Sequence, residues 1–233
     1  MQAYTANNGA RVSAAAAAVV FQGFPATRAR VADKAATLSG VRRTLTRGEE
    51  IFAEGDSSDF FYKVVSGTVR TYKLLSDGRR QIDEFHLAGD IFGLEPSEQH
   101  RFSAEAVDDA SVIMFRRRRF AAISQDDPAL GDQVMASLMR NLERAHDHMM
   151  LLGRKSAQER IATFLLDMSK RIAKGDSFDL PMQRSDIADH LGLTIETVSR
   201  TLTQFARDGL IKLAAASRSV VLCNKAALRQ LDA

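Results

Sequence analysis

The pattern of glycines and apolar residues changes at Pro128, and this change restricts the folds open to the chain. From about residue 40 to 120, short runs rich in Val, Ile, Phe, Tyr and Thr are interrupted by glycines, several of them 11 or 12 residues apart. Asp77-Gly78 is a strong signal for a hairpin turn and Ser66-Gly67 a weaker one. Many short strands at this spacing predict an antiparallel barrel or roll rather than β-α-β units.

After Pro128 the apolar residues follow a helical period for about six turns. The stripe is narrow and is flanked by charged residues, so we predict that this helix pairs with its copy in a symmetric dimer. A helix lying on its own domain is the alternative. Gly153 is expected just past the last helical turn. The predicted dimer residues are Leu130, Val134, Leu138, Leu142, Ala145, Met149 and Leu152.

A second helix is predicted to start at Ser156. Ser156 and Glu159 have the spacing of a capping box, in which each side chain accepts from the backbone of the other residue. An apolar face follows, and we place a domain boundary near residues 153–156. That face consists of Ile161, Phe164, Leu165 and Met168.

Residues 184–208 predict two helices joined by a tight turn, which is the arrangement of a helix-turn-helix. Gly192 suits a turn that needs a positive φ, and Thr194 can cap the second helix. The first helix has Ile187, Ala188 and Leu191 as its apolar residues. The second has Val198, Leu202 and Phe205 on one face and Ile195, Glu196, Ser199, Arg200 and Thr203 on the other.

The outer face of this second helix carries residue types that suit base reading. The rigid fork of Arg200 matches guanine O6 and N7, and Glu196 can accept from a cytosine amino group. An ordinary helical hairpin with a solvated Glu196–Arg200 salt bridge is the alternative, and spacing alone leaves the two close to even. Residues 209–213 and 219–222 predict a two-stranded wing, which favours DNA binding.

The distribution of charge agrees with a DNA-binding C-terminal part. The whole chain has a formal net charge of only +3. From residue 151 onward, however, it holds thirteen Lys or Arg and nine Asp or Glu, while the remainder is nearly neutral. The basic excess would therefore face phosphates. The single cysteine, Cys223, excludes an internal disulfide and a cysteine-held iron–sulfur cluster.

From about residue 44 to its end the chain resembles the CRP/FNR transcription regulators. The resemblance is carried by residues 48–56 (GEEIFAEGD), 61–67 (FYKVVSG), 89–93 (GDIFG) and 191–200 (LGLTIETVSR), the last of which is similar to the FNR/FixK branch. It implies an α+β chain: an antiparallel β-roll of the cyclic-nucleotide-binding jelly-roll type, a long dimerisation helix and a C-terminal winged helix-turn-helix. We place these at residues 40–127, 128–155 and 156–233, after an N-terminal tail and lead-in helix at 1–39.

The resemblance also implies roles for individual residues. Glu196, Ser199 and Arg200 would read bases of a TTGAT-N4-ATCAA-like palindrome, and we add Ile195 beside them. RNA polymerase is the implied protein partner, and genes of low-oxygen respiration, denitrification or nitrogen fixation are the implied targets. Residues expected to contact or position the DNA backbone are Arg184, Ser185, Thr194, Thr197 and Thr203.

The chain departs from the ligand-binding branches of this family. Leu94 follows Gly93 where the cyclic AMP binders have a ribose-binding glutamate, and Phe102 precedes Ser103 where they have a phosphate-binding arginine. A shifted alignment that uses the neighbouring Glu95 and Arg101 is the alternative. The N-terminal part has no cysteine for an iron–sulfur cluster, and we expect His86 to be a structural histidine at a strand end. We therefore expect no cofactor, metal or cyclic nucleotide. The alternative is a regulator gated by an unknown small ligand, or haem, in the roll.

Other segments receive simpler interpretations. We expect a cytoplasmic protein, with export as the alternative suggested by the apolar run at residues 13–20. Residues 146–148 (HDH) are expected on the solvated surface of the dimer helix, and Arg116–Arg119 on a solvated strand edge with a polymerase contact as the alternative. Cys223 is expected to be a buried structural thiol, with redox control as the alternative if it is exposed. No constellation of catalytic residues is present, so we do not expect an enzyme.

Overall fold

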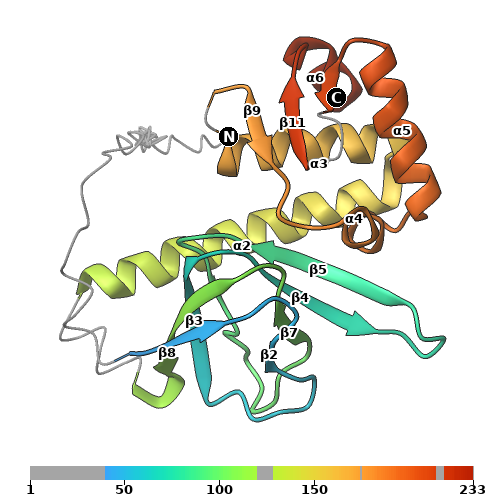
Figure 1. Ribbon diagram of the computed structural model, residues 1–233. Coiled ribbons are helices and arrows are strands. Elements are labelled where there is room, and N and C mark those ends of the chain that lie inside the picture. The colour runs from blue at the N-terminus through green and yellow to red at the C-terminus, as the bar shows by residue number, and fades with distance from the viewer. Residues whose placement is uncertain (1–39, 120–127, 174, 214–217, 233) are drawn as a thin grey trace, which may run out of the picture. The chain divides into compact units, whose positions relative to one another are not determined.

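The structure is a computed structural model that describes residues 40–119, 128–173, 175–213 and 218–232 (Figure 1). The expected N-terminal tail, its lead-in helix and the apolar run at 13–20 lie outside the described residues. Among the described residues, no helix is long and apolar enough to cross a membrane.

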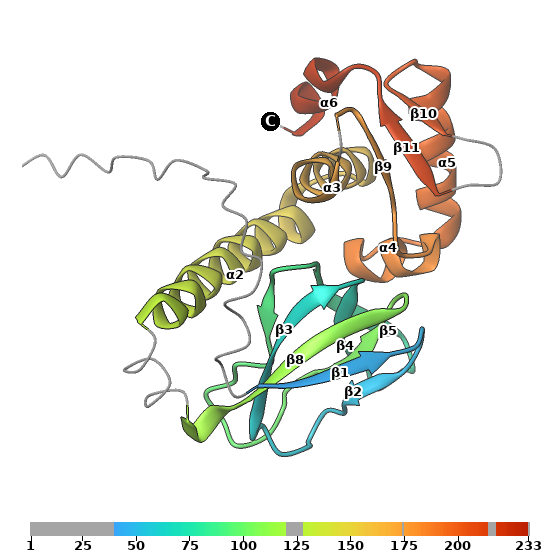
Figure 2. The same cartoon turned by 60° about the vertical axis from the view of Figure 1, so that its left-hand side comes forward.

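The first part of the described chain forms an antiparallel roll of two four-stranded sheets, as the glycine spacing predicts (Figure 2). One sheet has the order β1-β8-β3-β6 and the other β2-β7-β4-β5. Apolar side chains from both sheets fill the space between them, among them Tyr62 and Phe92, whose rings stack, and Phe52, whose ring is tilted against both. The strands are β1 (Val41–Leu45), β2 (Glu50–Phe52), β3 (Phe60–Ser66), β4 (Val69–Leu74), β5 (Arg80–His86), β6 (Ile91–Phe92), β7 (Ser103–Ala106) and β8 (Ala110–Arg116).

Two predicted turns are confirmed, and one of them depends strictly on glycine. Gly78, in the hairpin between β4 and β5, has a φ of 84°, and Gly67, between β3 and β4, has a φ of 76°. A Cβ atom on Gly67 would lie 2.5 Å from the carbonyl oxygen of Asp109, so no larger residue fits there without a shift of the backbone.

The long helix α2 runs from Pro128 to Arg154. The apolar residues predicted to form one dimer face on it are not all in the same environment. Val134 is buried with Phe61, Ile91 and Phe115 of the roll, so the prediction that it lies in a dimer interface is wrong. Gly153 lies inside the helix rather than beyond its end. Gly153 is not among the described glycines with a positive φ, so it does not end the helix, which continues to Arg154.

The C-terminal part combines helices with a small sheet of order β10-β11-β9. Ser156 caps α3 with the predicted capping box, and the predicted face of α3 is buried. Strand β9 adds a third strand to the wing, for which the sequence predicted two. The elements are α3 (Ala157–Ile172), β9 (Ser177–Asp179), α4 (Arg184–Leu191), α5 (Ile195–Arg207), β10 (Ile211–Leu213), β11 (Ser219–Leu222) and α6 (Lys225–Asp232).

Three further expectations are wrong. The basic run Arg116–Arg119 is not a strand, because β8 ends at Arg116 and Arg117–Arg119 form a 3-10 helix, η2. Cys223 follows the last residue of β11 and is exposed rather than buried. His148 is not a solvated residue of α2, because its ring stacks on that of His190 in α4 with centroids 4.2 Å apart.

Candidate nucleic-acid interface

Local sequence fixes the geometry of the two helices α4 and α5. Gly192 adopts the left-handed conformation with a φ of 62° and ends α4, as predicted. The backbone N–H of Leu193 donates to the carbonyl of Ala188 at 3.0 Å, which closes the turn. Thr194 then caps α5, because its hydroxyl accepts from the backbone N–H of Thr197 at 3.2 Å. The predicted cap and turn are therefore both confirmed.

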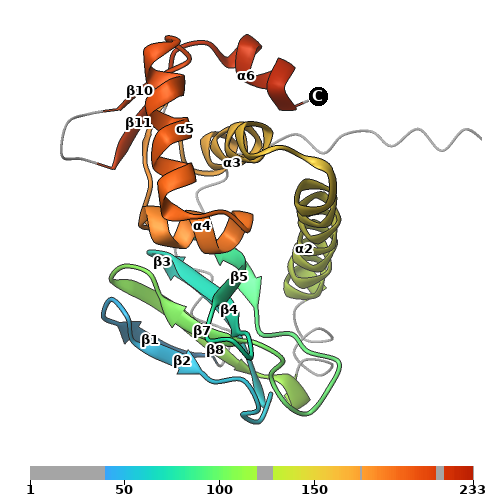
Figure 3. The same ribbon diagram turned by 90° about the vertical axis from the view of Figure 1, so that its right-hand side faces the viewer.

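The helix α5, which follows α4 directly (Figure 3), buries one face and exposes the other. Val198, Leu202 and Phe205 are buried in the core that they share with α3 and α4. The opposite face meets solvent at Glu196, Arg200 and Thr203, while Ser199 and Thr197 are partly buried. Ile195 is 48% exposed at the start of the helix.

Neither charged group on this outer face is in an ion pair with a described residue. Arg200 forms no hydrogen bond or ion pair with any other described residue, so the expected alternative of a Glu196–Arg200 salt bridge is not formed. The Glu196 backbone N–H, followed by the Thr194 hydroxyl and the charge of Arg200, lowers the pKa of the Glu196 carboxyl. Glu196 is therefore an ionised acceptor at neutral pH and Arg200 a free donor.

The residues expected at the DNA backbone lie around this face. Arg184, at the start of α4, donates to the Ser199 hydroxyl at 3.3 Å. The Thr203 hydroxyl donates to the carbonyl of Ser199 at 2.8 Å, and the Thr194 and Thr197 hydroxyls lie 3.0 Å apart. Ser185 is partly buried in α4. Arg184, Ser199 and Thr203 are thus linked by two hydrogen bonds, and Thr194 and Thr197 form a separate pair at the start of α5.

The predicted dimer stripe is only partly available on the surface of α2. Leu138, Leu142, Ala145 and Met149 are exposed, whereas Leu152 packs against the core of the C-terminal part. The side chain of Leu130 lies outside the described residues. The predicted stripe did not include three further exposed apolar residues of this helix, which are Met135, Met139 and Met150.

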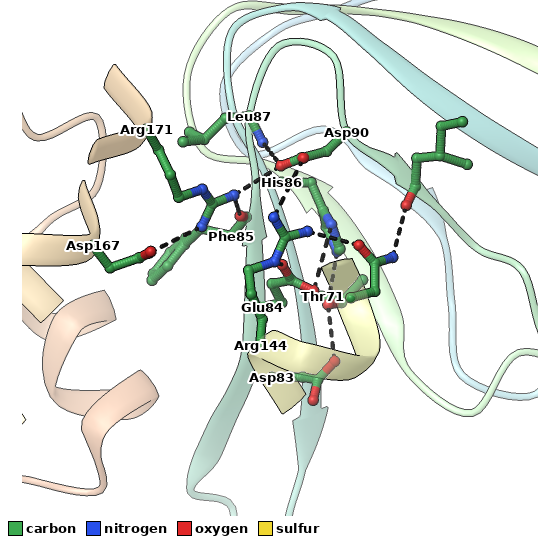
Figure 4. A network of polar contacts seen from close by, with 12 residues as sticks. Thr71, Asp83, Glu84, Phe85, His86, Leu87, Asp90, Arg144, Asp167 and Arg171 are labelled. Atoms are coloured by element: carbon green, nitrogen blue, oxygen red, sulfur yellow. Dashed lines mark hydrogen bonds and ion pairs between the residues drawn. The ribbon is translucent and has the colours of Figure 1, made fainter. Parts of the chain in front are cut away.

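A network of buried charges joins the roll to α2 and α3, and the sequence reasoning missed it (Figure 4). Asp90 accepts from Arg171 of α3 at 2.7 Å and lies 3.5 Å from Arg144 of α2. Glu84 of β5 pairs with Arg144 as well. Burial raises the pKa of Glu84 to about 7, although the charges of Arg144 and Arg171 act in the opposite direction. No local motif indicates these pairs, since the partners are far apart in sequence.

A pocket lies where the roll meets α2 and α3, and its lining includes Leu94 and Phe102, the two residues that depart from the cyclic AMP binders. His86 also lines it. Burial lowers the pKa of His86 to about 3, so the ring is neutral, and its Nε2 lies 3.1 Å from the Thr71 hydroxyl. The ring stacks on Phe92 with centroids 4.9 Å apart, which agrees with a structural role. The sequence reasoning missed a second buried histidine of the roll, His100, which stacks on Phe52.

A β-roll, a long helix and a winged helix-turn-helix with a polar outer face together define a class, the DNA-binding transcription regulators with a sensor-like N-terminal domain. Comparisons with known proteins agree. Residues 42–127 match the model of the cyclic nucleotide-binding domain, and residues 159–231 match that of the Crp-like helix-turn-helix domain. The chain belongs to the CRP/FNR family, in its FixK-like branch.

The similar proteins include regulators from several bacteria. The nitrogen fixation regulation protein FixK of Azorhizobium caulinodans is 46% identical over 88% of this chain and 84% of its own length. The transcriptional activator protein Anr of Pseudomonas protegens is 39% identical, over 72% of each chain. The solved structure of FixK2 from Bradyrhizobium japonicum is 46% identical, covers 84% of this chain and 98% of its own, and has a TM-score of 0.78.

Membership of this family settles the coarse function. The chain is a transcriptional activator of the CRP/FNR type that binds DNA through its helix-turn-helix, and the family consists of transcription regulators rather than enzymes.

Proposed function

We propose that the chain acts as a homodimer that activates transcription from TTGAT-N4-ATCAA-like palindromes, without a cyclic nucleotide or an iron–sulfur cluster. The observation that carries this proposal is the outer face of α5, where Glu196, Ser199 and Arg200 stand at the start of a recognition helix with neither Glu196 nor Arg200 in an ion pair with a described residue. Each half-site has a single G·C pair. Arg200 can donate to its guanine, and Glu196 can accept from the amino group of its cytosine.

The exposed apolar residues of α2 support the dimer. Leu138, Leu142, Met139 and Met149 leave more apolar surface in water than one surface helix normally does. Packing this face against its copy would bury it and would relate two recognition helices by a twofold axis, matching a palindromic site. Leu142→Glu should shift the protein toward monomer in sedimentation, while Arg140→Ala on the same helix should not.

The lining of the roll pocket supports independence from cyclic nucleotides. Leu94 and Phe102 place apolar groups in its lining at the two positions where the cyclic AMP binders have a carboxylate and a cation, and Glu95 and Arg101 of the same lining stand one residue away from those positions. Calorimetric titration with cyclic AMP and cyclic GMP should show no saturable binding. Saturable micromolar binding would establish the alternative, a regulator gated by a ligand in the roll.

Relatives named for nitrogen fixation regulation support the targets that we propose, which are genes of low-oxygen respiration, denitrification or nitrogen fixation. RNA polymerase would be the protein partner, and the cytoplasm the place of action. Selection of bound duplexes from random DNA, with and without candidate effectors, tests the proposal as a whole. It should recover the palindrome without any effector. Recovery of an unrelated sequence, or of none until an effector is added, would contradict it.

A further inference from the structure

We propose that strand β5 and the turn after it hold the DNA-binding helices in the pose that palindrome recognition requires, with Arg80 and Asp90 as the positioning residues at its two ends. The inference rests on the proposed function, because it concerns how the base-reading face of α5 is presented. It is carried by three sets of contacts along residues 80–90, each of which reaches a helix of the C-terminal part.

The first set lies at the start of β5 and engages α4, the first helix of the helix-turn-helix. Arg80 pairs with Asp186 at 2.6 Å, and its Nε donates to Asp189 at 2.9 Å. Arg70, on the neighbouring strand β4, pairs with the same oxygen of Asp186 at 2.8 Å. Asp186 is only 4% exposed, so this contact is largely shielded from solvent. Two guanidinium groups therefore converge on one helix, at its first turn.

The second set lies in the middle of β5 and uses the backbone. The Gln81 side-chain amide donates to the carbonyl of His190, the penultimate residue of α4, at 3.3 Å. The His190 Nδ1 lies 3.2 Å from the carbonyl of Ile82, and its ring meets the edge of Phe85 with centroids 5.2 Å apart. Helix α4 is thus held at its first and last turns by one strand, and this fixes its direction as well as its position.

The third set lies at the turn after β5 and engages α3 (Figure 4). Arg171 donates to the Asp90 carboxylate and to the carbonyl of Phe85, both at 2.7 Å. The other oxygen of Asp90 faces Arg144 of α2. Asp90 also accepts from the backbone N–H of Leu87 at 2.8 Å, which holds the turn itself. One carboxylate therefore ties the roll, α2 and α3 together.

These contacts bear on DNA recognition because α3, α4 and α5 share one core. Ile161 and Leu165 of α3, Ile187 and Leu191 of α4, and Val198 of α5 belong to the same buried cluster, which also contains Ile82 and Phe85 of β5. Buried ion pairs add little net stability but select one arrangement of the groups that form them. Docking α3 and α4 on β5 consequently fixes α5, while none of the docking residues occupies the outer face of α5.

The chain offers a matched control for the arginine. Arg79 precedes Arg80 in the same hairpin, but its side chain is 76% exposed and pairs only with Asp77 among the described residues. Arg79→Ala removes the same charge from almost the same place without touching α4. Any general effect of charge on DNA binding should therefore be equal in Arg79→Ala and Arg80→Ala, and only the positioning effect should differ.

The test uses the full chain and two labelled duplexes, one with the palindrome and one with the same bases shuffled. Arg80→Ala and the isosteric Asp90→Asn should each weaken binding to the palindrome about tenfold, and binding to the shuffled duplex less than about twofold, because nonspecific contacts tolerate a mobile helix. Arg79→Ala should bind both as the parent does. Asp189→Ala in the Arg80→Ala background should add little, because the two side chains form one contact.

The inference fails if Arg80→Ala and Asp90→Asn bind the palindrome as tightly as the parent does or more tightly. The contacts of β5 would then have no effect on specific binding or would oppose it. It also fails if both duplexes lose affinity equally, which would indicate general loss of structure. Asp90→Asn serves if Arg80→Ala does not fold. A different result would contradict the proposed function: the parent chain would bind the palindrome and the shuffled duplex equally well.

Discussion

Helices α4 and α5 belong to one motif but treat their polar side chains in opposite ways. On α4, Asp186 and Asp189 are paired with arginines of the roll, and His190 is hydrogen-bonded to it. On α5, neither Glu196 nor Arg200 is in an ion pair with a described residue, and the Glu196 carboxylate accepts only from the Thr194 hydroxyl and its own backbone N–H. The polar groups of α4 therefore contact the roll, whereas the charged groups of α5 remain available to a ligand. Four substitutions test this contrast.

The largest effect is expected from Asp186→Ala on the positioning helix. It removes the shared partner of Arg70 and Arg80 and leaves two poorly exposed guanidinium groups without that carboxylate. Arg70 keeps Glu105 and Arg80 keeps Asp189, but two shielded ion pairs and the cap on the Gln183 backbone N–H are lost together, so the free energy of unfolding should fall by about 3 kcal/mol in urea titration. Asp189→Ala, at a more exposed carboxylate, should cost less, about 1 kcal/mol. Equal losses would show that burial of Asp186 does not matter.

A comparable effect, but on binding instead of stability, is expected from Arg200→Ala on the reading helix. Specific binding should weaken by about 1–3 kcal/mol and the preference at one G·C pair should relax, with the melting temperature unchanged. Fluorescence anisotropy with single-base variants of the palindrome measures both. Arg229→Ala, at an exposed arginine of α6, is the control. If Arg200→Ala discriminated between duplexes as the parent does, α5 would not be the reading helix.

A smaller effect concerns acid stability and His190. Burial, then the neighbouring His148 and Arg171, lowers the pKa of His190 to about 3, despite hydrogen bonds to the carbonyls of Ile82 and Asp83. Since the folded state resists protonation, the stability from this group is complete above the ordinary histidine pKa of about 6.5 and is lost as pH falls below it. Between pH 6.5 and pH 5, His190 should therefore lower the free energy of unfolding by about 2 kcal/mol.

Burial also lowers the pKa of His86, His100 and His148, so His190→Gln should remove part of the acid loss rather than all of it. Urea titrations at pH 7.5 and pH 5 measure the difference. His146→Gln, at an exposed position of α2, is the matched control and should leave the slope as it is in the parent. An unchanged slope in His190→Gln would mean that His190 is not held neutral.

The smallest effect is expected at the junction between the two helices. Thr194→Ala removes the hydroxyl that accepts from the Thr197 backbone N–H and should destabilise α5 by about 1 kcal/mol. Thr194→Ser keeps the hydroxyl and should be close to the parent. Because the cap lies beside the reading face, specific binding should weaken with it. A stable Thr194→Ala with intact binding would show that α5 does not depend on its cap.

Local patterns allowed much of this molecule to be predicted. Turn glycines, the capping box at Ser156, the turn at Gly192 and the two faces of α5 each depend on neighbours within a few residues. The antiparallel roll, the winged helix-turn-helix and the family were therefore predicted and are confirmed. The base-reading and backbone roles of individual residues stay predictions, as do the domain limits.

What could not be predicted depends on distant partners. The sequence shows that Val134 lies on an apolar stripe of α2. It does not show that the roll of the same chain buries this residue, which leaves nothing for a second subunit to contact. The pairs of Arg80 with Asp186 and Asp189 join residues more than a hundred positions apart, and an arginine in a hairpin carries no sign of such a partner. Cys223 was expected to be buried from an apolar strand, yet that strand ends one residue earlier.

The carboxylate of Asp186 performs two tasks at once, and this has a consequence for how the protein opens. One oxygen accepts from the Gln183 backbone N–H at 3.0 Å and caps α4, while the other holds the roll arginines. Fraying of the first turn of α4 therefore breaks the docking, and undocking removes the restraint on that turn. Domain separation and helix fraying should consequently be one cooperative opening event, with amide exchange at the start of α4 reporting both.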